Sequence, residues 1–332
     1  MIDKEKVGLV KEIISKKNKI AITGHVNPDG DAIGSCLALY HFFKKLDFEV
    51  KICVPNKIPK FLKWLPDAKK IINHEYIKNT AESVLKHADI IFCVDYNSVE
   101  RTADMQHAIS NSKATKILID HHPEPQDFVD FTFSDTKISS AAELCYYFIK
   151  EYQPNLFDKS IAECLFTGII TDTGMFEYSS ATAETLKVAS FLMSFGIDKQ
   201  EILNQIYHNF SVDRMRLMGY VLNEKMIILP EKKTAYISLT KEEFKKYNYV
   251  VGDHENFVNL PLSINNIYVS ALFLEIDNSI RISLRSQGDY DVNKIARKYF
   301  SGGGHKNAAG GYSKLTMKET LKNFEEIIKK EL

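Results

Sequence analysis

Three short apolar runs in this 332-residue chain each end in a cluster of acidic and histidine residues, and this pattern strongly constrains the fold. The runs and the clusters that follow them are Ile20–Thr23 with Gly24–Asp31, Ile90–Val94 with Asp95, and Lys116–Ile119 with Asp120–His122. Segments with helical spacing of apolar residues separate the runs, and this alternation is typical of a parallel sheet with helices on both faces. Residues just past the strand ends of such a sheet converge on one edge, where open α/β folds bind ligands. We therefore predict that the clusters meet in one crevice.

The same pattern predicts an α/β protein with two domains, residues 1–205 and 206–332, as expected for a chain of this length. In the first domain we expect strands at 19–23, 48–54, 89–94 and 115–119, and helices at 3–17, 31–46, 139–151, 158–171 and 181–195. In the second we expect strands at 226–229, 234–237, 267–273 and 279–284, and helices at 291–299 and from residue 317. No Pro- or Gly-rich linker stands near the boundary, which predicts a helical connection.

Charge and cysteine content narrow the class of protein. Basic and acidic residues number 43 each, and the zero formal net charge argues against a continuous basic track for long nucleic acid. A short anionic substrate held by metals and a few arginines remains compatible with this balance. The five cysteines show no C-x-x-C spacing, which is typical of buried free thiols in a reducing compartment. The charged N-terminus and the lack of an apolar run of about 18 residues predict a cytoplasmic protein without a membrane span.

His25, Asp29 and Asp31 share one loop after the first predicted strand, and Pro28 and Gly30 shape its turn. Their spacing lets His25 and Asp29 face one metal ion while Asp31 faces a neighbouring ion. Carboxylate and imidazole ligands suit Mn²⁺ or Mg²⁺, with Zn²⁺, Fe²⁺ or Co²⁺ as alternatives. The competing explanation is an Asx-rich turn in which Asp31 caps the following helix.

Asp95 and the triplet Asp120-His121-His122 end the other two runs. Asp95 follows a predicted central strand and is the natural bridging ligand, although it could simply cap a turn. Adjacent residues that leave a strand point to different sides, so one imidazole of the triplet can bind metal while the other faces substrate. Asp120 fits either a ligand or an acceptor that fixes a histidine tautomer. The alternative for the triplet is a polar turn before Pro123.

Asp172 follows a fourth apolar segment, Cys164–Ile170, and a carboxylate at the end of a buried segment needs a partner. A metal ion would supply that partner; the alternative is a C-terminal turn helped by Gly174. No Lys or Arg stands within the four polar clusters. Their carboxylates should therefore repel one another unless cations bind among them.

The second domain contains a glycine-rich segment and two arginines on one predicted strand. The segment consists of Gly302, Gly303, Gly304 and His305. Bare backbone amides beside an imidazole can wrap a phosphate, although three glycines can also form a flexible hairpin. Arg281 and Arg285 lie at even spacing and so share a face of the strand. A guanidinium there can hold a phosphate or stack on a base, but Arg281 is better explained as part of a solvated face.

Together these motifs resemble the DHH phosphoesterase superfamily over nearly the whole chain. The matching motifs, in order, are His25-x-x-x-Asp29-x-Asp31, Asp95, Asp120-His121-His122, Asp172 and Gly302-Gly303-Gly304-His305. The length and the sequence of residues 24–35 are most similar to the bifunctional oligoribonucleases that also act as 3′-phosphoadenosine 5′-phosphate phosphatases. The resemblance implies a parallel-sheet DHH catalytic domain over residues 1–205 and a smaller DHH-associated, substrate-binding domain over 206–332.

The resemblance also implies a role for each matching residue. One Mn²⁺-type ion would be bound by His25, Asp29 and Asp95, and a second by Asp31, Asp95, His121 and Asp172, with Mg²⁺ or Co²⁺ as alternatives. His122 would contact the scissile phosphate or the leaving oxygen, supported by Asp120. The substrate would be held by Arg285, Gly302, Gly303, Gly304 and His305. Hydroxide would attack phosphorus in line, without a covalent enzyme intermediate.

We therefore expect a metal-dependent hydrolase that cleaves short oligonucleotides to mononucleotides and 3′-phosphoadenosine 5′-phosphate to AMP. Within the superfamily, the alternatives are a cyclic or linear dinucleotide phosphodiesterase and an exopolyphosphatase-like hydrolase. A nucleotide-binding sensor without catalysis would show substituted metal ligands, and no position of the pattern is substituted here. The sequence leaves a homodimer open.

Overall fold

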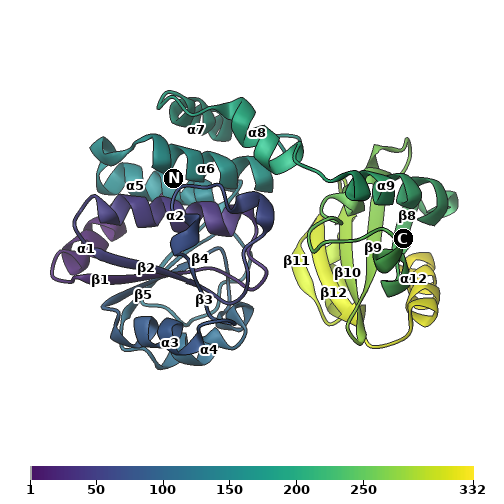
Figure 1. Cartoon of the computed structure of the whole chain (residues 1–332), viewed down its shortest axis with the longest axis horizontal. Helices are drawn as coiled ribbons and strands as arrows, with labels where there is room; N and C mark the ends of the chain where they lie inside the picture. The colour runs from purple at the N-terminus through teal and green to yellow at the C-terminus, as the bar shows by residue number, and fades with distance from the viewer. Residues whose placement is uncertain (1) are drawn as a thin grey trace. The chain divides into compact units, whose positions relative to one another are not determined.

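The computed structural model describes residues 2–332 and divides into two compact units, one ending at Asn209 and the other running from Phe210 to Leu332 (Figure 1). The predicted α/β class is confirmed, because a parallel sheet flanked by helices is followed by a second sheet with helices of its own. The predicted helical connection is wrong. Helix α8 (Lys199–Tyr207) stops before α9 (Val212–Tyr220) starts, and the Ser211 side chain caps α9 by accepting from the backbone N–H of Arg214 at 3.0 Å.

The first unit is built on a six-stranded sheet in which every pair of neighbours is parallel. The order across the sheet is β3 (Ile72–Asn73), β2 (Glu49–Val54), β1 (Lys19–Thr23), β4 (Ile90–Val94), β5 (Thr115–Asp120) and β6 (Phe131–Ser134). The other helices of this unit are α1 (Lys4–Ile14), α2 (Gly30–Lys44), α3 (Lys78–His87), α4 (Met105–Asn111), α5 (Ala141–Tyr152), α6 (Lys159–Asp172) and α7 (Ala183–Met193). The strand order reverses between β1 and β4, which is where such sheets open a crevice at their carboxyl ends.

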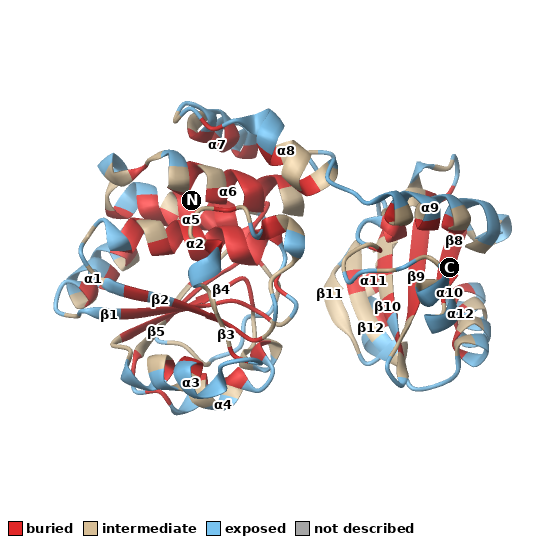
Figure 2. Ribbon diagram, viewed as in Figure 1, coloured by how far each residue is buried: buried red, intermediate tan, exposed pale blue. Residues whose placement is uncertain are grey.

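Both faces of this sheet are covered by helices (Figure 1). Ile22 and Phe92 pack on the face that carries α1, α2, α5 and α6, whereas Ala21 and Ile91 pack on the face that carries α3 and α4. Successive residues of a strand point to opposite faces, so a strand covered on both sides must be apolar throughout. β4 meets this requirement with five buried apolar residues (Figure 2).

Helices α2 and α6 approach closely because glycines face the contact. A Cβ at Gly34 would overlap the backbone of α6. A Cβ at Gly168 would lie 2.5 Å from the Cβ of Ala142 and 3.0 Å from Oδ1 of Asp31. The close approach sets the first turn of α2, which carries Asp31, against α6, which ends at Asp172.

The second unit contains a six-stranded sheet that is antiparallel except for the pair β8 and β9. The order is β11 (Gly303–His305), β12 (Ala308–Ser313), β10 (Ser279–Ser286), β9 (Val269–Ile276), β8 (Thr234–Leu239) and β7 (Met226–Leu229). Its further helices are α10 (Lys241–Lys246), α11 (Val292–Tyr299) and α12 (Met317–Glu331). α11 and α12 supply the core on one face of this sheet, and α9 with the 3₁₀ segment Phe257–Ser263 supplies a second core. The strands expected at 226–229 and 234–237 are present as β7 and β8, which form an antiparallel hairpin.

Candidate metal centre

The polar clusters of the first unit meet at the carboxyl edge of its sheet. β1, β4 and β5 are neighbours, so the loops that follow them leave the sheet side by side. The six residues expected to bind metal come from these three loops and from two helices: His25, Asp95, His121, Asp29, Asp31 and Asp172. Distances between their side chains show that the six form one cluster.

The cluster consists of two overlapping groups that share Asp95. Nε2 of His25 lies 3.3 Å from Oδ2 of Asp95 and 3.8 Å from Oδ1 of Asp29. Nε2 of His121 lies 3.6 Å from Oδ1 of Asp95, 3.7 Å from Oδ2 of Asp31 and 3.5 Å from Oδ2 of Asp172. These distances exceed the usual range of an N–H···O hydrogen bond. They are of the size expected for atoms that bind one ion together, which lie about 3–4 Å apart.

Asp95 is held in a conformation that keeps one carboxylate oxygen available. Its side chain is buried, its backbone is left-handed with φ of 63°, and its N–H donates to the carbonyl of Ile119 at 3.0 Å. Among the described residues, Oδ1 of Asp95 has no hydrogen-bond partner. A buried carboxylate oxygen without a donor is costly, and a cation would satisfy it. The donor set and this oxygen therefore fit a metal ion shared between the two groups.

The pKa shifts of the clustered residues also fit bound metal ions. Burial by itself lowers the pKa of His25, but contacts with Asp29 and Asp95 outweigh burial and raise the pKa to about 10. Burial and the charges of Asp95 and Asp172 raise the pKa of Asp31 well above its ordinary value. Neighbouring carboxylates contribute to both shifts, because crowded carboxylates attract protons when no other cation is near. Divalent ions would replace those protons.

Asp29 and Asp31 also have separate backbone partners. Oδ1 of Asp29 accepts from the N–H groups of Asp31 and Ala32, both at 3.0 Å, so Asp29 rather than Asp31 caps α2. The capping explanation for Asp31 is therefore wrong. Asp31 instead accepts from the first two N–H groups of α5, those of Ala141 at 2.7 Å and Ala142 at 2.8 Å. A carboxylate at a helix N-terminus is favoured by the helix dipole.

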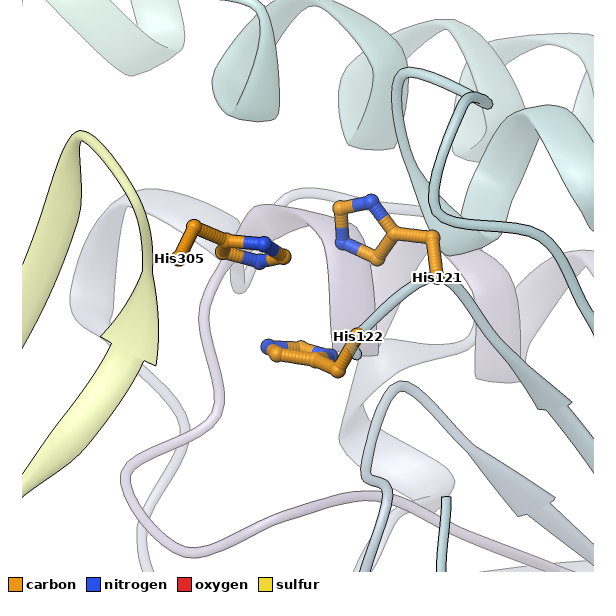
Figure 3. A group of neighbouring side chains, drawn as sticks. All are labelled: His121, His122 and His305. Carbon is orange, nitrogen blue, oxygen red and sulfur yellow. The ribbon is translucent and has the colours of Figure 1, made fainter. Parts of the chain in front are cut away.

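The two imidazoles of the triplet face different partners, as its alternation predicts. The rings of His121 and His122 lie edge to face with centroids 5.0 Å apart (Figure 3). His121 directs Nε2 to the carboxylates, whereas Nδ1 of His122 lies 2.7 Å from Oδ1 of fully buried Asp120. Burial, opposed by Asp95 and assisted by the charge of Arg101, lowers the pKa of His122 to about 3. The neutral ring therefore donates from Nδ1 to Asp120.

Arg101 is a member of this site that sequence reasoning missed. Its Nη1 donates to Nε2 of His122 at 2.9 Å, and its backbone carbonyl accepts from the N–H of Val26 at 2.7 Å. Arg101 lies on the 3₁₀ turn Val99–Thr102 that follows β4, so the same sheet edge that positions Asp95 also brings in a cation. The polar clusters contain no Lys or Arg, yet the folded site does. The available signal was the position of Arg101 six residues after Asp95.

In the second unit, the glycine-rich segment is an ordered strand and not a flexible loop. Gly303–His305 forms β11 and pairs antiparallel with β12, and His305 projects from this strand (Figure 3). A Cβ at Gly302 would overlap the carbonyl oxygen of Gly310, and Gly304 has φ of 144°, which disfavours other residues. Close backbone approach therefore requires these glycines.

Arg285 lies on β10 opposite Ala308 of β12. Its Nη1 donates to the carbonyl of Leu284 at 3.0 Å. In the same register Ser283 lies opposite Gly310, so the β12 residues beside Arg285 and Ser283 are small. Arg281 is exposed on that face, opposite Tyr312.

Comparison with known proteins decides the family. A model of the DHH family N-terminal domain matches residues 19–169, and a model of the DHHA1 domain matches residues 234–332. The bifunctional oligoribonuclease and PAP phosphatase NrnA of Bacillus subtilis is 30% identical over 300 residues, 90% of each chain. NrnA of Mycoplasma genitalium is 31% identical over 301 residues, 90% of this chain and 89% of the relative. An exopolyphosphatase-related protein from Bacteroides fragilis has a crystal structure with a TM-score of 0.96 and 42% identity, covering 99% of this chain and 97% of that one.

The chain belongs to the DHH family of phosphoesterases. The resemblance inferred from the motifs is thereby confirmed. In this DHH protein the first matched region contains the clusters at the ends of β1, β4 and β5, and it ends three residues before Asp172. The second contains Arg285 and the β11 segment. Among the helices of residues 2–332, none has the length and apolar character needed to cross a membrane.

Proposed function

We propose that this protein hydrolyses short oligonucleotides to mononucleotides and 3′-phosphoadenosine 5′-phosphate to AMP, with two divalent metal ions and Mn²⁺ as the first choice. The names of its relatives, oligoribonuclease and PAP phosphatase, support this substrate class. The observation that carries the proposal is the pair of overlapping donor groups that share Asp95. Mg²⁺ and Co²⁺ are the alternative ions.

In this proposal the two donor groups are the ligand sets. His25, Asp29 and Asp95 would hold one ion, and Asp31, Asp95, His121 and Asp172 would hold the other. Two bound divalent ions would supply Lewis acidity to the phosphate and lower the pKa of the attacking water. The protein keeps its ligands oriented through backbone contacts, since Asp31 accepts from two N–H groups of α5 and His121 contacts the carbonyl of Ile138 at 3.4 Å.

In this proposal, His122 and Arg101 lie on the side of the site that faces the phosphate. Asp120 fixes His122 as the tautomer with a proton on Nδ1, so Nε2 is an acceptor for the guanidinium. Arg101 is permanently charged and retains further N–H donors, which suits a phosphate oxygen. His122 thus contributes mainly by aiming Arg101, and Asp120 supports His122 instead of binding metal.

The second domain is proposed to hold the substrate, with residues 1–205 as the catalytic domain and 206–332 as the substrate-binding domain. Arg285 would grip a phosphate or stack on a base, while Gly302, Gly303, Gly304 and His305 offer backbone and imidazole contacts. The small β12 residues opposite Arg285 and Ser283 support this role, because they place no bulky side chain beside the guanidinium. Recognition of one substrate end would favour short molecules.

Exopolyphosphatase-like activity is the second candidate, because the Bacteroides fragilis structure is described as exopolyphosphatase-related. Purified protein with Mn²⁺ should be given short oligoribonucleotides, 3′-phosphoadenosine 5′-phosphate, cyclic and linear dinucleotides, and polyphosphate side by side. We expect the highest kcat/KM on oligonucleotides of a few residues. Release of neither mononucleotide nor phosphate from the first two substrates would overturn the proposal, and a preference for polyphosphate would establish the alternative.

Two further properties complete the proposal. All five cysteines are buried free thiols, which supports a reducing, cytoplasmic location. A homodimer is to be tested by light scattering of the purified protein, where a mass of twice 38.0 kDa is the expected result.

A further inference from the structure

Glu143 is a buried carboxylate next to the metal centre that belongs to neither donor group. It is the third residue of α5 and is 1% exposed. Its Oε2 accepts from Oγ of Ser139 at 2.5 Å, from the backbone N–H of Ser139 at 3.3 Å and from Oγ1 of Thr185 at 2.9 Å. Its Oε1 accepts from the hydroxyl of Tyr147 at 3.1 Å. All four donors are neutral, so hydrogen bonds alone must offset the cost of burying this carboxylate.

The segment that Glu143 holds contacts two of the proposed metal ligands. The carbonyl of Ile138 lies 3.4 Å from Nδ1 of His121. The N–H groups of Ala141 and Ala142 donate to the two oxygens of Asp31. Ser139 stands between these contacts, and Glu143 binds it through both its backbone and its side chain. Fixing Ser139 therefore fixes the carbonyl that orients His121 and the amides that orient Asp31.

A further hydrogen bond of Glu143 connects this segment to helix α7. Thr185 lies in the first turn of α7, where it also forms a capping box with Thr182. The bond from Thr185 to Glu143 spans 42 residues of sequence and is buried. α7 packs in the same core as α5, so this bond connects the segment to both helices.

We infer that Glu143 is a positioning residue for the metal centre, acting through Ser139 on His121 and through the start of α5 on Asp31. The inference rests on the metal-ligand assignment of the proposed function. Groups that orient metal ligands commonly change metal affinity by 10–100-fold when they are replaced. Glu143 is expected to act on ion binding before it acts on any substrate.

The competing explanation is that Glu143 merely stabilises the core, and two variants separate the explanations. Tyr147→Phe removes a hydrogen bond from the same carboxylate but leaves the Ser139 and Thr185 contacts intact. Glu243→Gln alters a similar carboxylate in the second unit, where Glu243 is the third residue of α10, accepts from the N–H of Thr240 at 2.8 Å and pairs with Lys225 at 2.8 Å.

The experiment is titration of the full-length variants with Mn²⁺ alone, by calorimetry, with thermal unfolding measured with and without Mn²⁺. Glu143→Gln and Ser139→Ala should weaken Mn²⁺ binding about 10-fold or more and shrink the Mn²⁺-induced rise in Tm. Tyr147→Phe and Glu243→Gln should stay within about 2-fold of the unchanged protein. If Glu143→Gln does not fold, Ser139→Ala decides the matter.

Unchanged Mn²⁺ affinity in Glu143→Gln and Ser139→Ala would overturn the inference, as would equal weakening in all four variants. The readout needs no substrate, so failure of the proposed function is seen separately. A protein that binds Mn²⁺ but cleaves no nucleotide would remove the proposed substrate and leave the role of Glu143 measurable. A protein that binds no Mn²⁺ would overturn both.

Discussion

The two units differ in the functional groups that their sheets present. At the carboxyl edge of the first sheet, buried acidic and histidine side chains are fixed by helix N-termini, a left-handed Asp95 and a hydrogen-bonded triplet. In the second sheet, the functional candidates are the Arg285 guanidinium and the glycine backbone, with small residues on the neighbouring strand β12. The first arrangement is held by many side-chain contacts, whereas the second presents a charged group beside small β12 residues. This difference supports the proposal that catalysis takes place in the first unit and substrate binding in the second.

Among the proposed variants, those at Asp95 are expected to have the largest effect on catalysis and metal binding. Asp95→Asn should lower kcat at least about 1,000-fold and abolish binding of one Mn²⁺ ion, because both donor groups depend on this residue. Asp120→Asn should lose less Mn²⁺, since Asp120 holds His122. Calorimetry with Mn²⁺ and initial rates on a short oligonucleotide measure both effects.

Asp89→Asn is the matched control for Asp95, because Asp89 stands at the other end of β4 and accepts from the backbone of Asn18 and Lys19. It should retain two ions and full kcat. Equal losses in Asp95→Asn and Asp120→Asn would contradict the ligand assignment.

Replacing Arg101 tests whether the first unit also contacts the substrate. Arg101→Lys should lower kcat about 100-fold with little change in Mn²⁺ affinity, because an ammonium cannot reproduce the planar fork that meets His122 and a phosphate together. Separate kcat and KM values measure this. A loss confined to Mn²⁺ affinity would instead make Arg101 a support for the ligands.

Replacing Arg285 tests the recognition side of the comparison. Arg285→Ala should raise KM for a short oligonucleotide about 10–30-fold while Mn²⁺ affinity stays unchanged, because one charged contact to phosphate is lost. Arg281→Ala, on the same strand face but exposed, should change KM less than about 2-fold. Similar KM values for both variants would show that Arg285 contributes no more to substrate binding than exposed Arg281.

Histidine protonation gives a test of folding stability, because the pKa shifts of His25 and His254 have opposite signs. Carboxylates raise the pKa of His25 to about 10, whereas burial and the charge of Arg281 lower that of buried His254 to about 4. For His254 the folded pKa lies below the unfolded value of about 6.5, so the unfolded state binds the proton more readily. The contribution of His254 is complete above pH 6.5 and is lost as pH falls towards 4, with about 2–3 kcal/mol gone at pH 4.5.

Urea unfolding of the full-length protein and of His254→Gln, compared from pH 7.5 to pH 4.5, isolates this contribution. The stability difference between the two proteins should narrow as the pH falls. A constant difference across that range would show that His254 does not titrate with folding.

Much of the fold and site follows from sequence because strand ends fix where side chains go. The positions of Asp95 and the triplet depend only on recognising two apolar runs and their parallel pairing. The short edge strands β3 and β6 escape such reasoning: β3 has only two residues, and β6 is the mixed sequence Phe-Thr-Phe-Ser. Arg101 escapes it too, because a 3₁₀ turn carries no periodic signal. The donors to Asp31 are backbone groups of alanines, which no residue pattern can reveal.

The β11 segment shows a different limit. Three glycines beside a histidine suggest a mobile phosphate loop, yet the steric demand of the neighbouring strand explains Gly302 and Gly304. Sequence identifies the glycines but not which of their properties is used. The distinction depends on how close β12 lies, which is a tertiary fact.

The lack of a side chain at Gly168 limits which substitutions the protein can accept at this position. Exchanging a helical glycine for alanine ordinarily favours the helix by about 1 kcal/mol. Here the added methyl would lie 2.5 Å from Ala142 and 3.0 Å from the Asp31 carboxylate, so it would wedge three helices apart at the metal centre. Attempts to make the enzyme more heat-resistant by removing helical glycines should therefore spare this position, where a sturdier helix would be obtained at the expense of catalysis.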